Sequence, residues 1–307
     1  MEENHIINLP THWQTYYAEI KDRCKNLIIA RIWNGIDVNR LNAWLKNFDT
    51  DAEKYLSACV LDSLMYRSNS KTKALIYHLF NVVLPNYTRI NPTPIGQIND
   101  WIERLQSTSQ DPGVRLVAAV SDNDPPTKSS HLVLRLLSKE FHIEEGWIIY
   151  PHKLKYHFQS GIRTFIFIDD FLGSGDQFTE LIYEYDLHNY EKRNKEKTYI
   201  LYCPLVAHER GVKHVTDSFS GKIPVVASEN LMEEMNFFDV YFSDQAETAR
   251  KFYIQMLKRR KIHFSKEDDY FGHGNLQIGY SFEHACPDNA LRILWYNDNN
   301  WTPLFDR

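Results

Sequence analysis

The sequence predicts an α/β fold built on a parallel sheet with helices on both faces. Apolar, β-branched runs suited to buried strands recur at 114–120, 147–150, 164–168, 199–206 and 223–227. Helical spacings of apolar residues lie between them, at about 132–141, 176–190 and 209–219. Strands that alternate with helices form crossover units, which give a parallel sheet buried on both faces. In such sheets ligands bind at the carboxyl ends of the strands, near a switch point in strand order.

The part of the chain before this core is expected to form a helical domain, residues 1–110. Asp37 can cap a short helix, and Thr50 with Glu53 forms a capping box before a second one. A third helix is expected through 75–83. Three short helices are typical of a winged-helix or helix-turn-helix arrangement, and equally of any small helical bundle.

The predicted α/β core spans 111–262 and closes with a long helix that Asp244 and Glu247 can cap and that reaches Lys261. The basic run at its end, 258–261, is interpreted as a solvated helix end rather than a nucleic-acid patch. In residues 263–307 we expect a strand at 277–282, followed by an aromatic tail. This C-terminal extension is expected to form a hood over the pocket.

Composition excludes several classes of protein. The 307 residues are 43% apolar and 24% charged, with a net charge of −5, which is ordinary for a globular domain and unlike a chain that coats nucleic acid. The four cysteines form no C-x-x-C pair, which argues against a metal cage or a disulfide framework. No signal peptide and no membrane-spanning stretch is apparent. We therefore expect a cytoplasmic protein without a membrane partner.

The strongest motif follows the strand at 164–168, where Asp169 and Asp170 stand at its carboxyl end. A small-residue turn then leads into the next helix: Gly173, Ser174, Gly175, Asp176 and Gln177. Ionised carboxylates accept hydrogen bonds from vicinal ribose hydroxyls, and a glycine turn before a helix N-terminus is suited to phosphate. The motif therefore predicts a ribose 5-phosphate site. Acid pairs after a strand also occur in metal-dependent hydrolases, in receiver-like folds and in ordinary helix caps.

These residues resemble the ribose-phosphate signature of type I phosphoribosyltransferases. More narrowly, the core Asp169–Gln177 resembles that of the phosphoribosyltransferase-like effectors of bacterial conflict systems. Trp44 and Phe48 fit this resemblance. Its closing pattern is Gly272-His-Gly-Asn275, Gln277, His284-x-x-Pro287-x-Asn289-x-Leu291-x-x-Leu294-Trp295 and Trp301-x-Pro-Leu-Phe-x-Arg307. The transferases of nucleotide metabolism differ, because they usually carry glycine where Asp176 stands and a hydroxyl where Gln177 stands. A carboxylate beside a phosphate repels it unless it points away or binds a metal.

The resemblance also assigns supporting residues. The loop 121–130 corresponds to the pyrophosphate loop, in which Ser121 and Ser129 would contact the ligand and Lys128 would neutralise charge. Ser129 or Ser130 would cap the following helix. An ordinary solvated loop has the same composition.

Four further residues are candidates for contacting a base or acceptor. His208 stands at a strand end, and His284, Asn289 and Trp295 stand in the tail. A helix start explains His208 equally well, and core packing explains the tail residues.

Three functions follow as hypotheses. The first is an enzyme that acts at C1 of a ribose 5-phosphate, phosphoribosyl pyrophosphate or nucleotide, with Mg2+ near Asp169 and Asp170 bridging ligand oxygens. The resemblance implies a toxic effector in antiphage defence that works with a reverse transcriptase and its RNA–DNA product, as in retrons, within a complex or homo-oligomer. The second is a nucleotide sensor without turnover. The third is a DNA-associated scaffold that uses the N-terminal helices.

Overall fold

The computed structural model describes residues 7–91, 98–125, 128–190 and 197–307. Its contacts group the chain into two compact units. One unit is continuous and runs over Lys71–Leu231. The other combines the described residues up to Ser70 with Met232–Arg307. These boundaries differ from the expected division at 110 and 262, because the first helices share one core with the end of the chain.

The continuous unit contains the predicted parallel sheet. It has five strands in the order β3-β2-β4-β5-β6, and every neighbouring pair is parallel. The strands are β2 (Val114–Ala118), β3 (Ile148–Ile149), β4 (Thr164–Leu172), β5 (Tyr199–His208) and β6 (Glu229–Leu231). The chain passes from β2 to the edge strand β3 and then returns to β4 on the other side of β2. The switch point in strand order therefore lies between β2 and β4.

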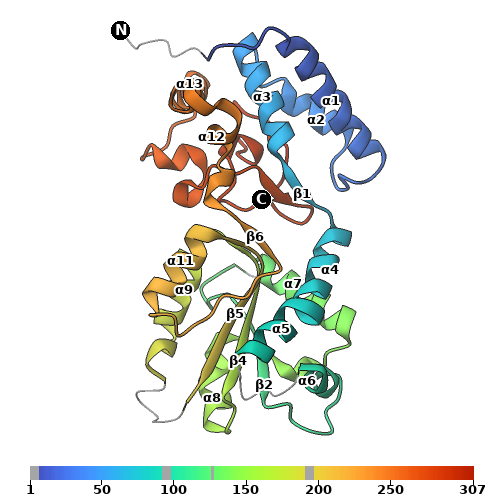
Figure 1. The fold of residues 1–307 in the computed structure, drawn as a ribbon, viewed down its shortest axis with the longest axis vertical. Coiled ribbons are helices and arrows are strands. Elements are labelled where there is room, and N and C mark those ends of the chain that lie inside the picture. Colours follow the sequence, from blue (N-terminus) through green and yellow to red (C-terminus); the bar gives the residue numbers. More distant parts are fainter. Residues whose placement is uncertain (1–6, 92–97, 126–127, 191–196) are drawn as a thin grey trace. The chain divides into compact units, whose positions relative to one another are not determined.

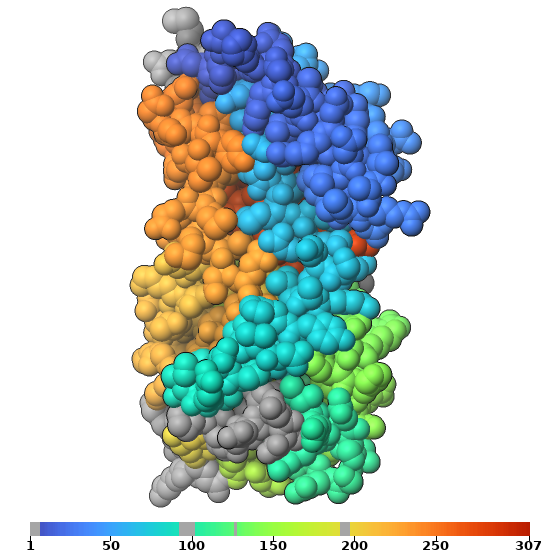
Figure 2. All heavy atoms as spheres, turned by 45° about the vertical axis from the view of Figure 1, so that its right-hand side comes forward, coloured from blue at the N-terminus to red at the C-terminus, as the bar shows by residue number. Residues whose placement is uncertain are grey.

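Helices cover both faces of this sheet. They are α4 (Asn69–His78), α5 (Leu84–Ile90), α6 (Ile98–Leu105), α7 (Ser129–Phe141), α8 (Leu154–Gln159), α9 (Asp176–Glu184) and α11 (Glu209–Ser218), with a π-helical segment, Leu79–Val83, before α5. Figure 1 shows α9 and α11 on one side of the strands, and α4, α5 and α7 on the other. The segment from α4 to α5, cyan to teal in Figure 2, forms part of the outer surface of this unit.

One predicted strand of the core was misplaced. At 223–227 the chain makes an isolated bridge, in which Val225 pairs with Tyr202, and the last strand of the sheet is β6. Pro224 lacks the backbone N–H that a regular ladder needs at this point, although its carbonyl accepts a hydrogen bond from the Tyr202 amide.

The discontinuous unit contains the helices α1 (Trp13–Ile29), α2 (Val38–Leu45), α3 (Asp51–Ser63), α12 (Phe237–Phe242) and α13 (Ala246–Arg259). Two short strands, β1 (Met65–Arg67) and β7 (Tyr280–Phe282), pair in parallel. Its core joins the two ends of the chain. The Trp44 indole donates a hydrogen bond to the carbonyl of Ile293 at 2.6 Å, and the ring of Phe48 packs edge-on against that of Trp301.

The predicted helix starts were partly correct. Asp37 caps α2 by accepting from the Arg40 amide, and both halves of the Thr50–Glu53 capping box are present at α3. The predicted cap of α13 is wrong. That helix begins after Gln245 without a side-chain cap, because Asp244 lies in a preceding 3-10 turn.

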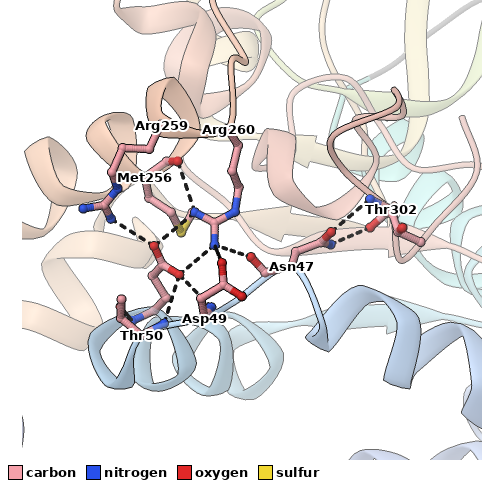
Figure 3. Close-up of polar contacts among 8 residues, drawn as sticks. Asn47, Asp49, Thr50, Met256, Arg259, Arg260 and Thr302 are labelled. Atoms are coloured by element: carbon pink, nitrogen blue, oxygen red, sulfur yellow. Dashed lines mark hydrogen bonds and ion pairs between the residues drawn. The ribbon is translucent and has the colours of Figure 1, made fainter.

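Glu53 does more than cap α3. It is 2% exposed, and its carboxylate accepts from Arg259 at 2.9 Å and from Arg260 at 2.7 Å (Figure 3). Burial alone would raise the pKa of Glu53, but the hydrogen bonds from Arg260 and from the amides of Asp49 and Thr50 hold it below its usual value. The basic run 258–261 is therefore not simply a solvated helix end, since two of its arginines bind a buried carboxylate of the same unit.

None of the described helices has both the length and the apolar character that crossing a bilayer would require.

Candidate ligand-binding site at the switch point

The two acids of the core motif lie where β4 continues beyond its neighbour. Pairing between β2 and β4 ends at Ala118 and Ile168, whereas β4 runs on to Leu172 beside β5. Asp169 and Asp170 therefore occupy the carboxyl end of the β2–β4 pair, at the switch point. The sequence located this position correctly, although the strand extends four residues further than predicted.

Asp169 is held almost entirely by the protein. Its Oδ1 accepts from the Ser130 hydroxyl at 2.6 Å and from the Asp170 amide at 2.9 Å, and its Oδ2 accepts from the Tyr202 hydroxyl at 2.9 Å. Asp169 is 5% exposed. Burial, reinforced by the neighbouring Asp170 carboxylate, raises the pKa of Asp169 to about 8. This carboxyl group is therefore suited to holding a proton and positioning its neighbour.

Asp170 lies beside the start of α7. Its Oδ1 accepts from the Ser129 hydroxyl at 2.8 Å. Both loop serines thus donate to the acid pair, and the prediction that one of them caps α7 is wrong, because the N-cap residue is Lys128 and no side chain caps this helix. The arrangement places negative charge at the positive end of the α7 dipole, which stabilises an ionised carboxylate there.

The turn after the acids has the glycine backbone conformation that was predicted, but the Ser174 hydroxyl already has a partner within the protein. Gly175 has φ +92°, in the left-handed region that favours glycine, and is the N-cap of α9. The Ser174 hydroxyl donates to Asp176 Oδ2 at 2.8 Å, and His214 Nε2 lies 3.7 Å from Asp176 Oδ1. The carboxylate at the start of α9 therefore takes up a donor that the sequence assigned to a phosphate.

The turn packs tightly against the start of α11. A Cβ added to Gly211 would lie 2.3 Å from the carbonyl oxygen of Gly173 and 2.9 Å from Cγ of Leu172. Only a residue without a side chain permits this approach. Gly211 thus fixes the position of the turn, and the sequence analysis gave it no such role.

The loop after β2 contacts the turn. Lys128 Nζ donates to Gln177 Oε1 at 2.9 Å, and Gln177 Nε2 donates to the Ala119 carbonyl at 3.2 Å. Lys128 also lies 3.5 Å from a carboxylate oxygen of Asp124. Ser121 points elsewhere, because its hydroxyl donates to Glu184 near the far end of α9. The structure thus joins Lys128 and Ser129 to the acids and the turn, but gives Ser121 a different partner.

The four candidates for contacting a base or acceptor have structural contacts. His208 is buried at the end of β5, and its Nδ1 accepts from the Arg210 amide at the start of α11. The other three belong to the discontinuous unit. There His284 stacks on Phe282, Asn289 donates to a backbone carbonyl, and the Trp295 indole donates to the Ala290 carbonyl. Their role in contacting a base stays a prediction.

Tyr202 is a site residue that the sequence analysis missed. It lies on β5, is fully enclosed, and stacks on Phe178 with ring centroids 3.7 Å apart. Its hydroxyl reaches Asp169 because both side chains project from the same face of adjacent strands. Strand alternation could have placed Tyr202 on that face, but the register that aligns Asp169 with Pro204 is not encoded in any local motif.

The acids fit a magnesium ion that is shared with a ligand, and not one held by protein alone. In the described part of the chain no group of three or more histidine, cysteine or acidic side chains is placed to hold a metal. Mg2+ usually keeps waters and binds through one or two carboxylates plus phosphate oxygens of the substrate. Asp170 offers a carboxylate of that kind, whereas both oxygens of Asp169 accept from protein donors.

Comparison with known proteins identifies the family. The model of a protein family described as PRTase-CE matches residues 41–307, which is most of the chain and includes every site residue discussed above. No curated protein matches the chain.

Proposed function

The chain belongs to the PRTase-CE family and is phosphoribosyltransferase-like. From that premise we propose that it binds the ribose of a nucleotide or of phosphoribosyl pyrophosphate and acts at ribose C1. The observation that carries the proposal is the meeting of three parts at the switch point. The loop after β2 supplies Ser129 and Lys128, β4 supplies the acids, and the turn leads into α9. Ligands of open α/β sheets bind at this place.

The residues divide the work on the proposed substrate. Asp170 accepts hydrogen bonds from the ribose hydroxyls. Ser130 and Tyr202 fix the Asp169 side chain by donating to it, and Asp169 in turn positions Asp170 through the backbone that joins them. Lys128 stabilises negative charge on a departing pyrophosphate. Asp170 would hold a bound Mg2+, which would neutralise phosphate charge. An ionised carboxylate beside the ring also stabilises the positive charge that develops at C1 in an oxocarbenium-like transition state.

The test is to incubate the protein with phosphoribosyl pyrophosphate and Mg2+, with and without nucleobases, and to measure pyrophosphate release. We expect release by the wild type and loss of at least 100-fold in rate for Asp170→Asn, about 3 kcal/mol of transition-state stabilisation. Asp217→Asn is the matched control, because Asp217 is an exposed acid on α11 in the same unit. Full activity of the Asp170 variant would refute the assigned role.

A sensor without turnover is the second candidate. Two observations favour it: Asp176 engages the Ser174 hydroxyl at the start of α9, and both oxygens of Asp169 accept from protein donors. A sensor would bind phosphoribosyl pyrophosphate or a nucleotide in calorimetry and release no pyrophosphate. Release that requires Asp170 would exclude it.

We further propose that this activity serves antiphage defence, as a toxic effector that works with a reverse transcriptase and its RNA–DNA product. The support is the resemblance of the core Asp169–Gln177 and of the closing pattern to conflict-system effectors. The test is a plaque assay in bacteria that carry the protein together with a reverse transcriptase and its RNA template. Protection that persists unchanged in the Asp170→Asn variant would contradict an effector role for the site.

A further inference from the structure

Three aromatic rings meet near the end of β3 and form what we call the ring stack: Tyr150 and His152 come from the segment after β3, and His131, tilted by 57° against Tyr150, comes from α7. Tyr150 follows β3 directly and is 48% exposed. Its ring lies 5.6 Å from that of His131 on α7 and 5.9 Å from that of His152, with the Tyr150 and His152 planes only 5° apart. The His152 side chain is 42% exposed. Tyr150 therefore presents aromatic surface to solvent between two imidazoles.

The same contacts tie this ring stack to the acid pair. His131 follows Ser130, whose hydroxyl donates to Asp169, so the first turn of α7 carries both a ring of the stack and a donor to the acids. Neighbouring Cα atoms are about 3.8 Å apart. On the other side His152 Nδ1 lies 2.7 Å from Asp122, in the loop that follows β2. The stack therefore belongs to the same end of the sheet as the proposed ribose site.

We infer that Tyr150, flanked by His131 and His152, is a stacking surface for the nucleobase of a nucleotide whose ribose lies at Asp170. This rests on the proposed function and adds the ligand class, a base-bearing nucleotide rather than a bare sugar phosphate. Every nucleobase has a π-face, and base–aromatic stacking contributes about 1–3 kcal/mol per base. A half-exposed tyrosine that two rings hold in place loses little side-chain entropy when a base covers it.

This places the base partner within the α/β unit. The tail residues His284 and Trp295, which the sequence nominated for a base, already use their rings or indole N–H in contacts within the discontinuous unit. The stack at Tyr150 instead offers an exposed ring, beside a loop that also carries Lys128.

The experiment measures dissociation constants by calorimetry for AMP, CMP and ribose 5-phosphate, with the wild type and three variants. Tyr150→Ala removes the ring and Tyr150→Phe keeps it. Tyr156→Ala is the matched control, because Tyr156 is a 65% exposed tyrosine on α8 whose ring also contacts a histidine.

We expect AMP and CMP to bind the wild type more tightly than ribose 5-phosphate. Tyr150→Ala should weaken nucleotide binding by about 5- to 100-fold, the equivalent of about 1–3 kcal/mol, and leave ribose 5-phosphate unchanged. Tyr150→Phe and Tyr156→Ala should bind like the wild type.

Two results would overturn the inference alone while the proposed function stands. In the first, ribose 5-phosphate binds and the nucleotides bind no more tightly. In the second, Tyr150→Ala leaves nucleotide affinity unchanged or weakens all three ligands equally. Failure of the wild type to bind any of the three ligands would overturn the inference, and failure to bind phosphoribosyl pyrophosphate as well would overturn the proposed function.

Discussion

Replacement of Asp169 by asparagine is expected to remove a pH dependence from the stability of the α/β unit. An amide imitates the protonated carboxyl group, since its oxygen can accept from Ser130 and the Asp170 amide. Its NH2, like a carboxyl O–H, would donate to the Tyr202 oxygen once the Tyr202 hydroxyl, which donates to Asp169 in the structure, turns away. The variant therefore keeps the geometry and loses only the titration. It separates the charge of Asp169 from its packing.

The size of the effect follows from the raised pKa. An unfolded aspartate has a pKa of about 3.9, whereas burial and the Asp170 carboxylate raise that of folded Asp169 to about 8. Between these values the folded chain holds a proton that the unfolded chain has released. The contribution to stability is therefore complete below about pH 4 and is lost as the pH rises through about 8. One proton changes the free energy of unfolding by about 1.4 kcal/mol per pH unit, so the loss from pH 6 to pH 8 is about 2–3 kcal/mol.

The assay compares thermal melts of the wild type and the Asp169→Asn variant from pH 5 to pH 9. Relative to the variant, the wild type should lose roughly 5–10 °C in Tm between pH 6 and pH 8. Titrating groups that do not interact with Asp169 are common to both proteins and cancel in the difference. Parallel curves across this range would show that folded Asp169 is ionised throughout, like the unfolded residue, which would refute the argument from burial.

Three further predictions concern the turn and the discontinuous unit. Asp176→Gly should raise affinity for ribose 5-phosphate about 10-fold in calorimetry, because it removes a carboxylate from the start of α9; unchanged affinity would mean that no phosphate approaches this turn. Gly211→Ala should lower the free energy of unfolding by about 1–3 kcal/mol in urea, since the new Cβ would lie 2.3 Å from the Gly173 oxygen. A variant as stable as the wild type would show that the turn and the start of α11 can move apart at no cost. Glu53→Gln should cost about 3 kcal/mol by the same measurement, because Arg260 then keeps a poorly compensated charge, and Glu247→Gln, at a 71% exposed side chain, is its control.

The α/β core was largely predictable because its signals are local. Buried strands are short apolar runs, and the acids of β4 follow one of them in an uninterrupted motif. The capping box at Thr50 is likewise contained within four residues. By contrast, α1 was missed, because its N-cap, His12, makes no side-chain bond that would mark a helix start. Its buried residues Ile20, Cys24 and Ile28 do follow the four-residue spacing of one helix face.

What could not be predicted depends on contacts between distant residues. The pairing of Trp44 with Ile293 and of Glu53 with Arg260 spans more than 200 positions, so no window on the sequence reveals that both ends of the chain share a core. A fragment of residues 1–110 would lack these partners. A test of DNA binding by the N-terminal helices therefore needs the full chain. The role of Tyr202 and the close approach of Gly211 were hidden for the same reason.

Asp169 and Asp170 are adjacent carboxyl groups, of which one can carry the negative charge while the other holds a proton. Adjacent carboxylates repel each other, and burial of Asp169 resolves the conflict by leaving the proton on that residue. Asp170 lies beside the positive end of α7, where its carboxylate accepts from the Ser129 hydroxyl. On the proposed function, the ribose hydroxyls bind the Asp170 carboxylate alone. Asp169 contributes by keeping a proton and by accepting a hydrogen bond from the Asp170 amide, which fixes the backbone between the two acids. Loss of the proton at high pH should then weaken the site together with the fold, since both depend on the same buried group.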